Sequence, residues 1–217
     1  MLDIQTASAD AAAAATPIVI HREDYCAPDW LVPNIDLDFA LDADRTVVSA
    51  RLSVALSGAH DRPLVLDGEG LELLSVKVDG AALPRDQWPQ GDAPLTISLS
   101  ATTHIIETTV ALSPASNSQL MGLYASGGLL CTQCEAEGFR RITYFLDRPD
   151  VLSRYTVRME ADKALYPVLL ANGDPVESGE GENGRHWARW NDPFPKPCYL
   201  FALVAGDLAC NADSFTT

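Results

Sequence analysis

Residues 129–150, "LLCTQCEAEGFRRITYFLDRPD", bring together more side chains capable of chemistry than any other stretch of the sequence. They include two cysteines spaced as C-x-x-C, two glutamates two residues apart and two adjacent arginines. Such a set could form a redox dithiol, part of a zinc knuckle or a catalytic carboxylate pair. It could also be a strand that runs into a loop, and the surrounding sequence has to discriminate between these.

The two cysteines of this segment, Cys131 and Cys134, are not in the setting of a redox dithiol. A thioredoxin-type thiolate lies where a strand meets a helix, whereas the flanking sequence here indicates strands. A zinc knuckle needs a second ligand pair, and Cys198 and Cys210 are too far apart and lack a nearby histidine. Residues three apart on a strand also point to opposite faces. We therefore interpret both cysteines as small hydrophobic residues in or beside the core.

The two glutamates offer a different chemistry. On an extended segment Gln133, Glu135 and Glu137 would face the same way and could line a cleft. The simpler interpretation is a solvated face whose acids pair with Arg140 and Arg141, and residue chemistry alone favours it. A glycosidase-like carboxylate pair is disfavoured, because acids at i and i+2 do not flank a bond from opposite sides.

Other catalytic motifs are absent from the sequence. The histidines are scattered, and no H-E-x-x-H, G-x-S-x-G, P-loop or dinucleotide fingerprint occurs. We therefore predict that this chain has no metal site and no catalytic residue of its own.

The elements that must position these residues are strands. Period-two alternation over residues 35–41 and 48–56 predicts a hairpin with one buried face. "LELLSVKVDG", "APLTISLS", "THIIETTVAL", "RYTVRMEA", "YPVLLANGDP" and "GRHWARWND" predict further strands, and "CYLFALVAGDL" predicts one that is buried on both faces. One short helix is predicted in "PDVLSRY", residues 149–155. The fold class is therefore all-β, a sandwich or an extended twisted sheet with few short helices.

Composition excludes several kinds of partner. The chain has 217 residues and a formal net charge of −15, which argues against binding nucleic acid. It has neither an apolar run long enough to span a bilayer nor a cationic amphipathic segment, so no membrane partner is expected. Residues 1–20 are Ala-rich and acidic, and we expect a disordered leader followed by one domain over residues 21–217. Five cysteines without an export signal favour a cytoplasmic location.

Long stretches of the chain resemble a known family. "HREDYCAPDW", "NIDLDFALDADRTVVSARL", "LCTQCEAEGFRRITYFLDRPDVLSRY" and "NGRHWARWNDPFPKPCYLFALVAGDL" are similar to the N-terminal domain of the gluzincin zinc aminopeptidases, in their bacterial aminopeptidase N branch. The resemblance covers nearly everything except the leader and some middle strands. It implies a saddle of β-sheet that caps a thermolysin-like catalytic domain, in an enzyme that removes N-terminal residues from peptides.

The resemblance also implies site residues. The T-Q-x-E element of the family corresponds to residues 132–135 and reaches into the active site. By that resemblance Glu135 binds the α-ammonium of the peptide. Gln133 lines the pocket for the first side chain or contacts the peptide backbone, and no role falls to Glu137.

The resemblance places zinc and the catalytic residues elsewhere. In the family, the zinc-binding H-E-x-x-H helix, the third glutamate ligand and a G-x-M-E-N loop belong to a catalytic domain, and none of these motifs occurs in this sequence. The expected partners are therefore peptide N-termini and the enzyme's own catalytic domain. We expect this chain to be an excised or truncated piece that folds but does not hydrolyse peptides.

The alternative is a free-standing β-sandwich binding module without catalytic activity. Its platform would be exposed tryptophans, drawn from Trp30, Trp88, Trp187 and Trp190. Packing within the core or sheet is the simpler interpretation for each of them.

Overall fold

The computed structural model describes residues 21–216, so the leader expected over residues 1–20 lies outside the described part, as does Thr217. The described chain is built from strands, and five of the segments outside them contain a single turn of 3-10 helix. The strands are β1 (Trp30–Ala40), β2 (Thr46–Leu56), β3 (Leu64–Leu66), β4 (Glu72–Val78), β5 (Ala81–Ala82), β6 (Leu95–Ile97), β7 (Thr103–Leu112), β8 (Gly122–Ser126), β9 (Leu129–Gln133), β10 (Leu152–Asp162), β11 (Val168–Ala171), β12 (Asp174–Glu180), β13 (Arg185–Pro197) and β14 (Leu203–Gly206). The 3-10 turns are η1 (Arg22–Asp24), η2 (Arg85–Gln87), η3 (Pro114–Ser116), η4 (Phe139–Arg141) and η5 (Cys198–Leu200).

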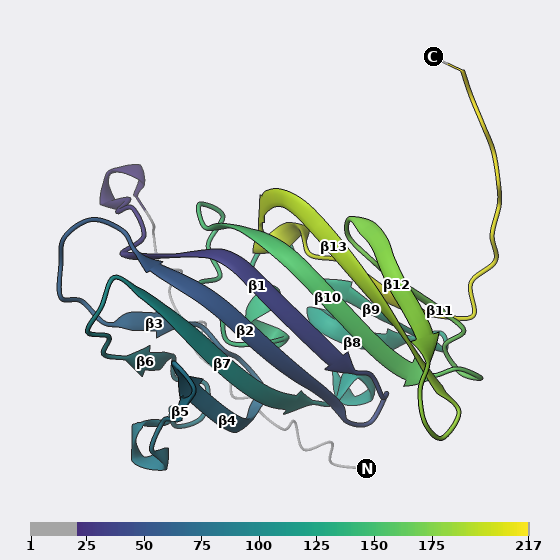
Figure 1. Ribbon diagram of the computed structural model, residues 1–217, viewed down its shortest axis with the longest axis horizontal. Helices are drawn as coiled ribbons and strands as arrows, with labels where there is room; N and C mark the ends of the chain where they lie inside the picture. Colours follow the sequence, from purple (N-terminus) through teal and green to yellow (C-terminus); the bar gives the residue numbers. More distant parts are fainter. Residues whose placement is uncertain (1–20, 217) are drawn as a thin grey trace, which may run out of the picture.

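The strands form one large sheet and two small ones. The large sheet has eight strands in the order β12-β13-β10-β1-β2-β7-β4-β5, and a four-stranded sheet has the order β11-β14-β9-β8. A third sheet pairs β3 with β6. Figure 1 shows β8, β9 and β11 behind the large sheet, on the side opposite the viewer. The all-β fold class expected from the sequence is confirmed.

The predicted hairpin is formed by β1 and β2 and confirms the sequence pattern. Leu37 and Phe39 of β1 are buried, whereas Asp36 and Asp38 between them are exposed. Leu37 lies opposite Ala50 in the antiparallel register. Period-two alternation puts one face of the hairpin on the core and the other in solvent, which fixes the register of the pair.

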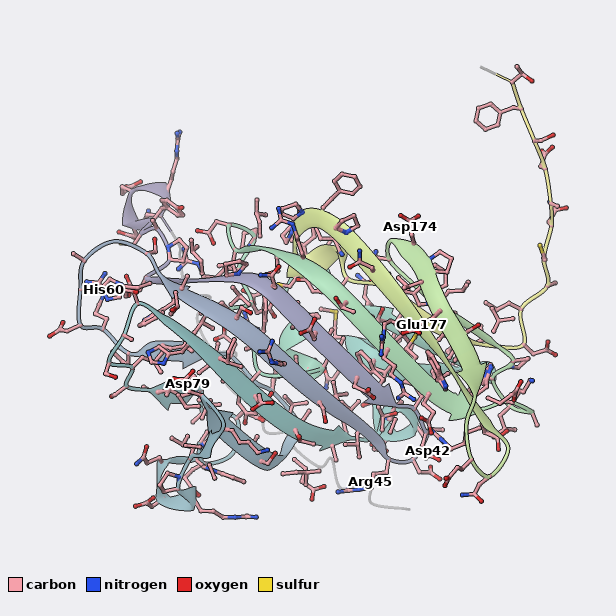
Figure 2. All side chains as sticks on the ribbon, viewed as in Figure 1. Asp42, Arg45, His60, Asp79, Asp174 and Glu177 are labelled. Atoms are coloured by element: carbon pink, nitrogen blue, oxygen red, sulfur yellow. The ribbon has the colours of Figure 1, made fainter. Side chains whose placement is uncertain are left out.

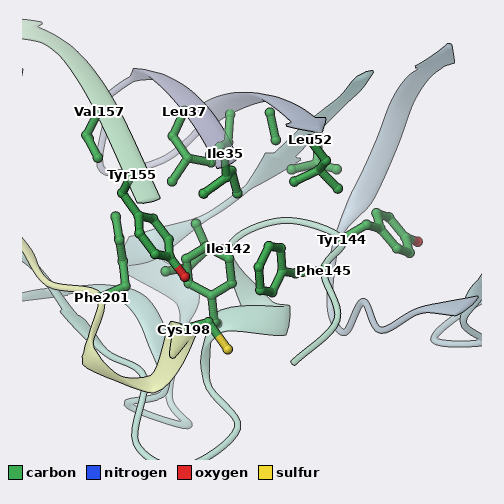
Figure 3. Packing of buried hydrophobic residues seen from close by; sticks show 14 of the residues in the cluster. Ile35, Leu37, Leu52, Ile142, Tyr144, Phe145, Tyr155, Val157, Cys198 and Phe201 are labelled. Carbon is green, nitrogen blue, oxygen red and sulfur yellow. The ribbon is translucent and has the colours of Figure 1, made fainter. Parts of the chain in front are cut away.

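The core lies between the large sheet and the elements behind it. Tyr155 on β10 contacts Phe139 of η4, with ring centroids 6.1 Å apart and nearly perpendicular planes. Phe201 closes the cluster, 5.2 Å from Phe139 and 5.9 Å from Tyr155 between centroids. Figure 3 shows Tyr155 and Phe201 packed with Ile142 and Phe145 beneath the strands. The segment rich in reactive residues is therefore anchored by its own aromatic side chains.

The short helix predicted over residues 149–155 is wrong. The chain makes a turn at Pro149 and Asp150 and enters β10 at Leu152. From there Ser153 and Tyr155 are buried on one face of the strand. An isolated helix of seven residues is marginal in water, whereas β10 gains hydrogen bonds from β1 on one side and β13 on the other.

The continuous buried strand predicted for "CYLFALVAGDL" is also wrong in part. Its first residues form η5, and Leu200 there is 50% exposed. Only Leu203–Gly206 is a strand, β14, which lies between β11 and β9. The run is apolar because two separate elements contribute buried residues, which a hydropathy pattern cannot distinguish from one long strand.

The outer face of the large sheet is polar. It is hollowed by a groove of about 550 Å³ and carries cross-strand ion pairs such as Arg158 with Asp38, 3.3 Å apart. Figure 2 shows Glu177 on β12, and Asp42 and Arg45 at the turn between β1 and β2. In the part of the chain that the structure describes, no helix is long and apolar enough to cross a membrane.

Candidate functional site

The β8–β9 hairpin brings the candidate site residues to the end of a strand. Its two-residue turn is Gly127-Gly128, both with positive φ of 58° and 85°, which matches the turn required by the twist of a hairpin. The other edge of β9 pairs with β14, where Cys131 lies opposite Val204. Held on both sides, β9 ends at Gln133.

The chain leaves β9 through a tight turn over residues 134–138. The amide of Gly138 donates to the carbonyl oxygen of Cys134 at 2.9 Å and closes the turn. Cys134 and Gly138 at its two ends are buried, whereas Glu135 and Glu137 are exposed. The peptide bond that follows Glu135 is cis.

This geometry corrects the expected row of side chains on an extended segment. Gln133 is the last residue of the strand, and both glutamates lie in the turn rather than on a continuing strand. All three side chains are exposed. Their exposure results from the turn and not from the alternation of side chains along an extended strand. The turn occurs here because Gly138 allows the chain to fold back on β9.

Gly138 is required by a close approach of two chain segments. A Cβ at this position would lie 2.3 Å from the carbonyl oxygen of Gln133 and 2.9 Å from Cα of Cys134. Its φ of −86° is open to any residue, so the need for glycine is steric. The glycine thus brings the start of η4 against the end of β9.

The two glutamates have different surroundings. Glu137 pairs with Arg140, with 3.4 Å between Oε1 and Nη2. Within residues 21–216 the carboxylate of Glu135 has no hydrogen-bond or ion-pair partner. The expected pairing of the acids with the two arginines is therefore right for Glu137 only, because Arg141 pairs with Glu69 instead.

Asp147 is a residue of this site that the sequence analysis missed. Its side chain is 1% exposed and accepts from Nε of Arg140 at 2.9 Å and from the main-chain amide of Arg140 at 3.1 Å. Cys198 donates its thiol to the other carboxylate oxygen at 3.0 Å. The sequence signal that could have revealed it is an aspartate directly after the apolar run "ITYFL". That position suggests a buried acid, and a buried acid needs a charged partner.

Cys134 is a packing residue, as interpreted from the sequence, whereas Cys131 lies at the edge of the core. Cys134 and Cys198 are buried, Cys131 is half-buried, and all five cysteines are free thiols. Burial, and secondly the charge of Asp147, raises the pKa of the Cys134 thiol to about 12. Burial likewise raises the pKa of Cys198. A thiol with a raised pKa is a poor nucleophile at neutral pH, so Cys134 does not fit the role of a reactive thiol in a redox dithiol.

The described residues do not fit a zinc ion. Among residues 21–216 no group of three or more His, Cys, Asp or Glu side chains is arranged to hold a metal. Two of the histidines serve the fold: Nδ1 of His104 contacts Asp79 at 2.6 Å, and Nε2 of His186 contacts the carbonyl oxygen of Tyr166 at 2.8 Å.

The tryptophans do not form an exposed platform. Trp30 is buried, and the other three are half-buried. The indole N–H groups of Trp30, Trp88 and Trp190 donate to main-chain carbonyl oxygens. The feature on which the binding-module alternative depended is therefore missing.

Comparison with known proteins identifies the family. The family model of the peptidase M1 N-terminal domain matches residues 32–200. This range includes the β8–β9 hairpin, the turn over residues 134–138 and Asp147. The chain belongs to the peptidase M1 N-terminal domain family. This M1 domain is 53% identical over 201 residues to aminopeptidase N of Escherichia coli and 52% identical over 202 residues to that of Caulobacter vibrioides.

Solved structures agree with this assignment. Aminopeptidase A of Legionella pneumophila, in complex with aspartic acid, superposes with a TM-score of 0.81 at 37% identity. It covers 86% of the M1 domain, which covers 22% of that chain. An M1 zinc metallopeptidase of Deinococcus radiodurans has the same fold at 21% identity, with a TM-score of 0.69. The matches to the E. coli and Caulobacter relatives cover 93% of this chain. The chain spans only 23% of the length of each of these relatives.

Proposed function

We propose that this M1 domain binds the free amino terminus of a peptide through Glu135, as the part of a zinc-dependent aminopeptidase that caps the active site. The observation that carries the proposal is the exposed carboxylate of Glu135, which has no partner in the described part of the chain, beside the paired carboxylate of Glu137. The relatives include aminopeptidase N of E. coli and an M1 zinc metallopeptidase of D. radiodurans, which supports the reaction class.

The chemistry of an exopeptidase needs such a group. The end of a peptide is marked by a positive amine with several N–H donors, and a fixed carboxylate measures the distance from that end to the bond to be cleaved. Charge-assisted hydrogen bonds contribute about 1.5–3 kcal/mol each. A peptide with a blocked amine would leave the carboxylate without a partner, which penalises its binding. Glu135 thereby selects chain ends over chain interiors.

Gln133 is placed to act beside Glu135. Its side chain is exposed at the end of β9, and its amide nitrogen donates to the main-chain carbonyl oxygen of Glu135 at 3.1 Å. In the proposal its carbonyl oxygen or amide faces the first residue of the peptide, where it lines the pocket for the first side chain or contacts the backbone.

Zinc and the catalytic groups lie outside this chain in the proposal. The described residues hold no metal site, so the Lewis acid and the general base are assigned to a catalytic domain of the same enzyme. The domain over residues 21–217 is therefore inactive alone. Free thiols at all five cysteines support a reducing, cytoplasmic setting.

The proposal is tested by Glu135→Gln in the full-length enzyme. The amide keeps the shape of the side chain and removes its charge. We expect kcat/KM for a free-amine alanyl substrate to fall by at least about 100-fold, the equivalent of two charge-assisted hydrogen bonds, with zinc content unchanged. The matched control is Glu177→Gln, which breaks the pair with Arg189 on the outer face of the large sheet. Unchanged kinetics of Glu135→Gln would remove this residue from the site.

A further inference from the structure

A buried carboxylate lies beneath the turn that carries Glu135. Asp147 is 3% exposed as a residue, and its partners come from η4 and η5. Its Oδ2 accepts from the main-chain N–H and Nε of Arg140, and its Oδ1 accepts from the thiol of Cys198. The main-chain carbonyl oxygen of Asp147 accepts from Nη2 of Arg140 at 3.2 Å. Arg140 is therefore held by Asp147 at three of its nitrogen atoms.

Arg140 in turn fixes the exit of the turn. Its carbonyl oxygen accepts from the main-chain N–H of Glu69 at 3.0 Å, so its backbone is bonded on both sides. The next amide, that of Arg141, donates to the carbonyl oxygen of Gly138 at 3.1 Å, and Gly138 closes the turn on Cys134. These hydrogen bonds, joined by the short stretches of backbone between them, thus connect buried Asp147 to the turn that presents Glu135.

The guanidinium of Arg140 is surrounded by acids on its Nε and Nη2 side. Asp147, Glu137 and Asp67 have carboxylate oxygens 2.9, 3.4 and 3.9 Å from its nitrogens. Because three carboxylates surround this one cation, the net local charge is negative. Arg140 is engaged by these acids and does not form an ion pair with Glu135. Since a cationic amine is attracted to such a surrounding, the same cluster that holds the turn also favours the proposed ligand.

We propose that Asp147 and Arg140 are positioning residues for amine recognition: they lock the turn over residues 134–138 so that Glu135 is fixed and unpaired when the peptide arrives. This inference rests on the proposed function. Neither residue touches the peptide. Their effect is pre-organisation, because a turn that is already ordered loses less conformational freedom when the amine binds.

The test compares two ligands of the full-length enzyme by calorimetry: a non-hydrolysable phosphinic alanyl dipeptide mimic and the same compound without its α-amine. The ratio of their dissociation constants reports only on amine recognition. We expect Asp147→Asn and Arg140→Lys each to reduce this ratio by about tenfold, while the affinity for the compound without the amine stays within about twofold. In the Glu135→Gln background, Asp147→Asn should reduce the ratio no further, because the positioning residue acts through Glu135.

Asp150→Asn is the matched control. It removes an Arg–Asp pair of the same kind in the same segment, since Oδ2 of Asp150 lies 2.7 Å from Nη2 of Arg148. That pair is not connected to the turn by any of the bonds described above, so the ratio should not change.

The outcomes separate the two proposals. A ratio that is unchanged in Glu135→Gln overturns the proposed function itself. A ratio that collapses in Glu135→Gln but stays at its normal value in Asp147→Asn and Arg140→Lys overturns only the positioning role. Equal weakening of both ligands would show structural damage and also overturn it. Arg140→Lys keeps a positive charge beside the buried acid, so it carries the test if Asp147→Asn does not fold.

Discussion

The side-chain amide of Gln133 donates a hydrogen bond to the main-chain carbonyl oxygen of Glu135, 3.1 Å away. The last residue of β9 therefore holds the backbone of the residue whose carboxylate has no partner among residues 21–216. A strand is a rigid support, and this bond extends its rigidity by two residues into the turn.

Gln133→Met should weaken the enzyme through this bond. Methionine has a similar length but cannot donate, so the carbonyl oxygen of Glu135 loses a neutral hydrogen bond worth about 0.5–1.5 kcal/mol. We expect kcat/KM for free-amine substrates of the full-length enzyme to fall by about 2–12-fold. Gln87→Met, at an exposed position of η2, is the control. A Gln133→Met enzyme that equals the control would show that the bond is dispensable.

Gly138→Ala should destabilise the isolated domain. The new Cβ would lie 2.3 Å from the carbonyl oxygen of Gln133, which is main chain and cannot turn aside. Overpacking of this kind costs about 1–3 kcal/mol, measured as the free energy of unfolding in urea. Gly91→Ala is the comparison, because Gly91 has a φ of 57° and no neighbouring atom within 4 Å. It should cost about 1–2 kcal/mol for the backbone conformation alone and leave the turn intact.

The thiols should react in two classes. Cys26 and Cys210 are exposed, whereas Cys134 and Cys198 are buried and have raised pKa values. Ellman's reagent at pH 8 should therefore label Cys26 and Cys210 rapidly in the native domain and all five cysteines in denaturant. Rapid reaction at half-buried Cys131, located by mass spectrometry, would contradict the packing interpretation and revive a redox role.

Stability should fall at high pH because of Cys134. Its folded-state pKa is about 12 and the ordinary value is 9.0. The unfolded chain therefore loses this proton first, so the contribution is complete below pH 9 and is lost as the pH rises towards 12. The linkage slope is about 1.4 kcal/mol of unfolding free energy per pH unit in that window. Urea unfolding from pH 8 to 10 should show a shallower decline for Cys134→Ala than for the parent, whereas Cys210→Ala should follow the parent.

Tyr155→Phe should stabilise the domain. The hydroxyl of Tyr155 is buried and has no hydrogen-bond partner among the described residues, while its ring packs against Phe139 and Phe201. Removing an unsatisfied buried hydroxyl recovers about 1 kcal/mol, and phenylalanine retains the ring. Tyr155→Leu, which loses the ring, should be less stable than the parent. A Tyr155→Phe domain with a lower melting temperature would reveal a partner for the hydroxyl.

The sequence was sufficient for the strands that have one wet face. Ile35, Leu37 and Phe39 alternate with polar residues because β1 lies with one face on the core, and such alternation is visible without the structure. It was insufficient where an element is short or buried. Residues 149–155 carry a proline and an acid that suit a helix start, yet the neighbouring strands decide the conformation of β10.

Charge pairing was predictable only in part. Arg140 reaches Glu137 three residues away, as the sequence suggested. Arg141 instead pairs with Glu69, 72 residues away, and Asp147 meets the thiol of Cys198 across 51 residues. These partners are brought together by the tertiary fold, since Glu69 lies in the loop after β3 and Cys198 begins η5. Local sequence spacing carries no information about such contacts. The unpaired state of Glu135 is a tertiary property for the same reason.

The pairing of β1 with β10 sets an order of events during synthesis. These two strands are parallel, and Asn34 lies opposite Arg154, about 120 residues later in the chain. The ribosome must therefore make more than half of this domain before the centre of its largest sheet can close. Until then the β1–β2 hairpin has an open edge able to pair with another chain, so we expect the nascent protein to depend on chaperones over this interval.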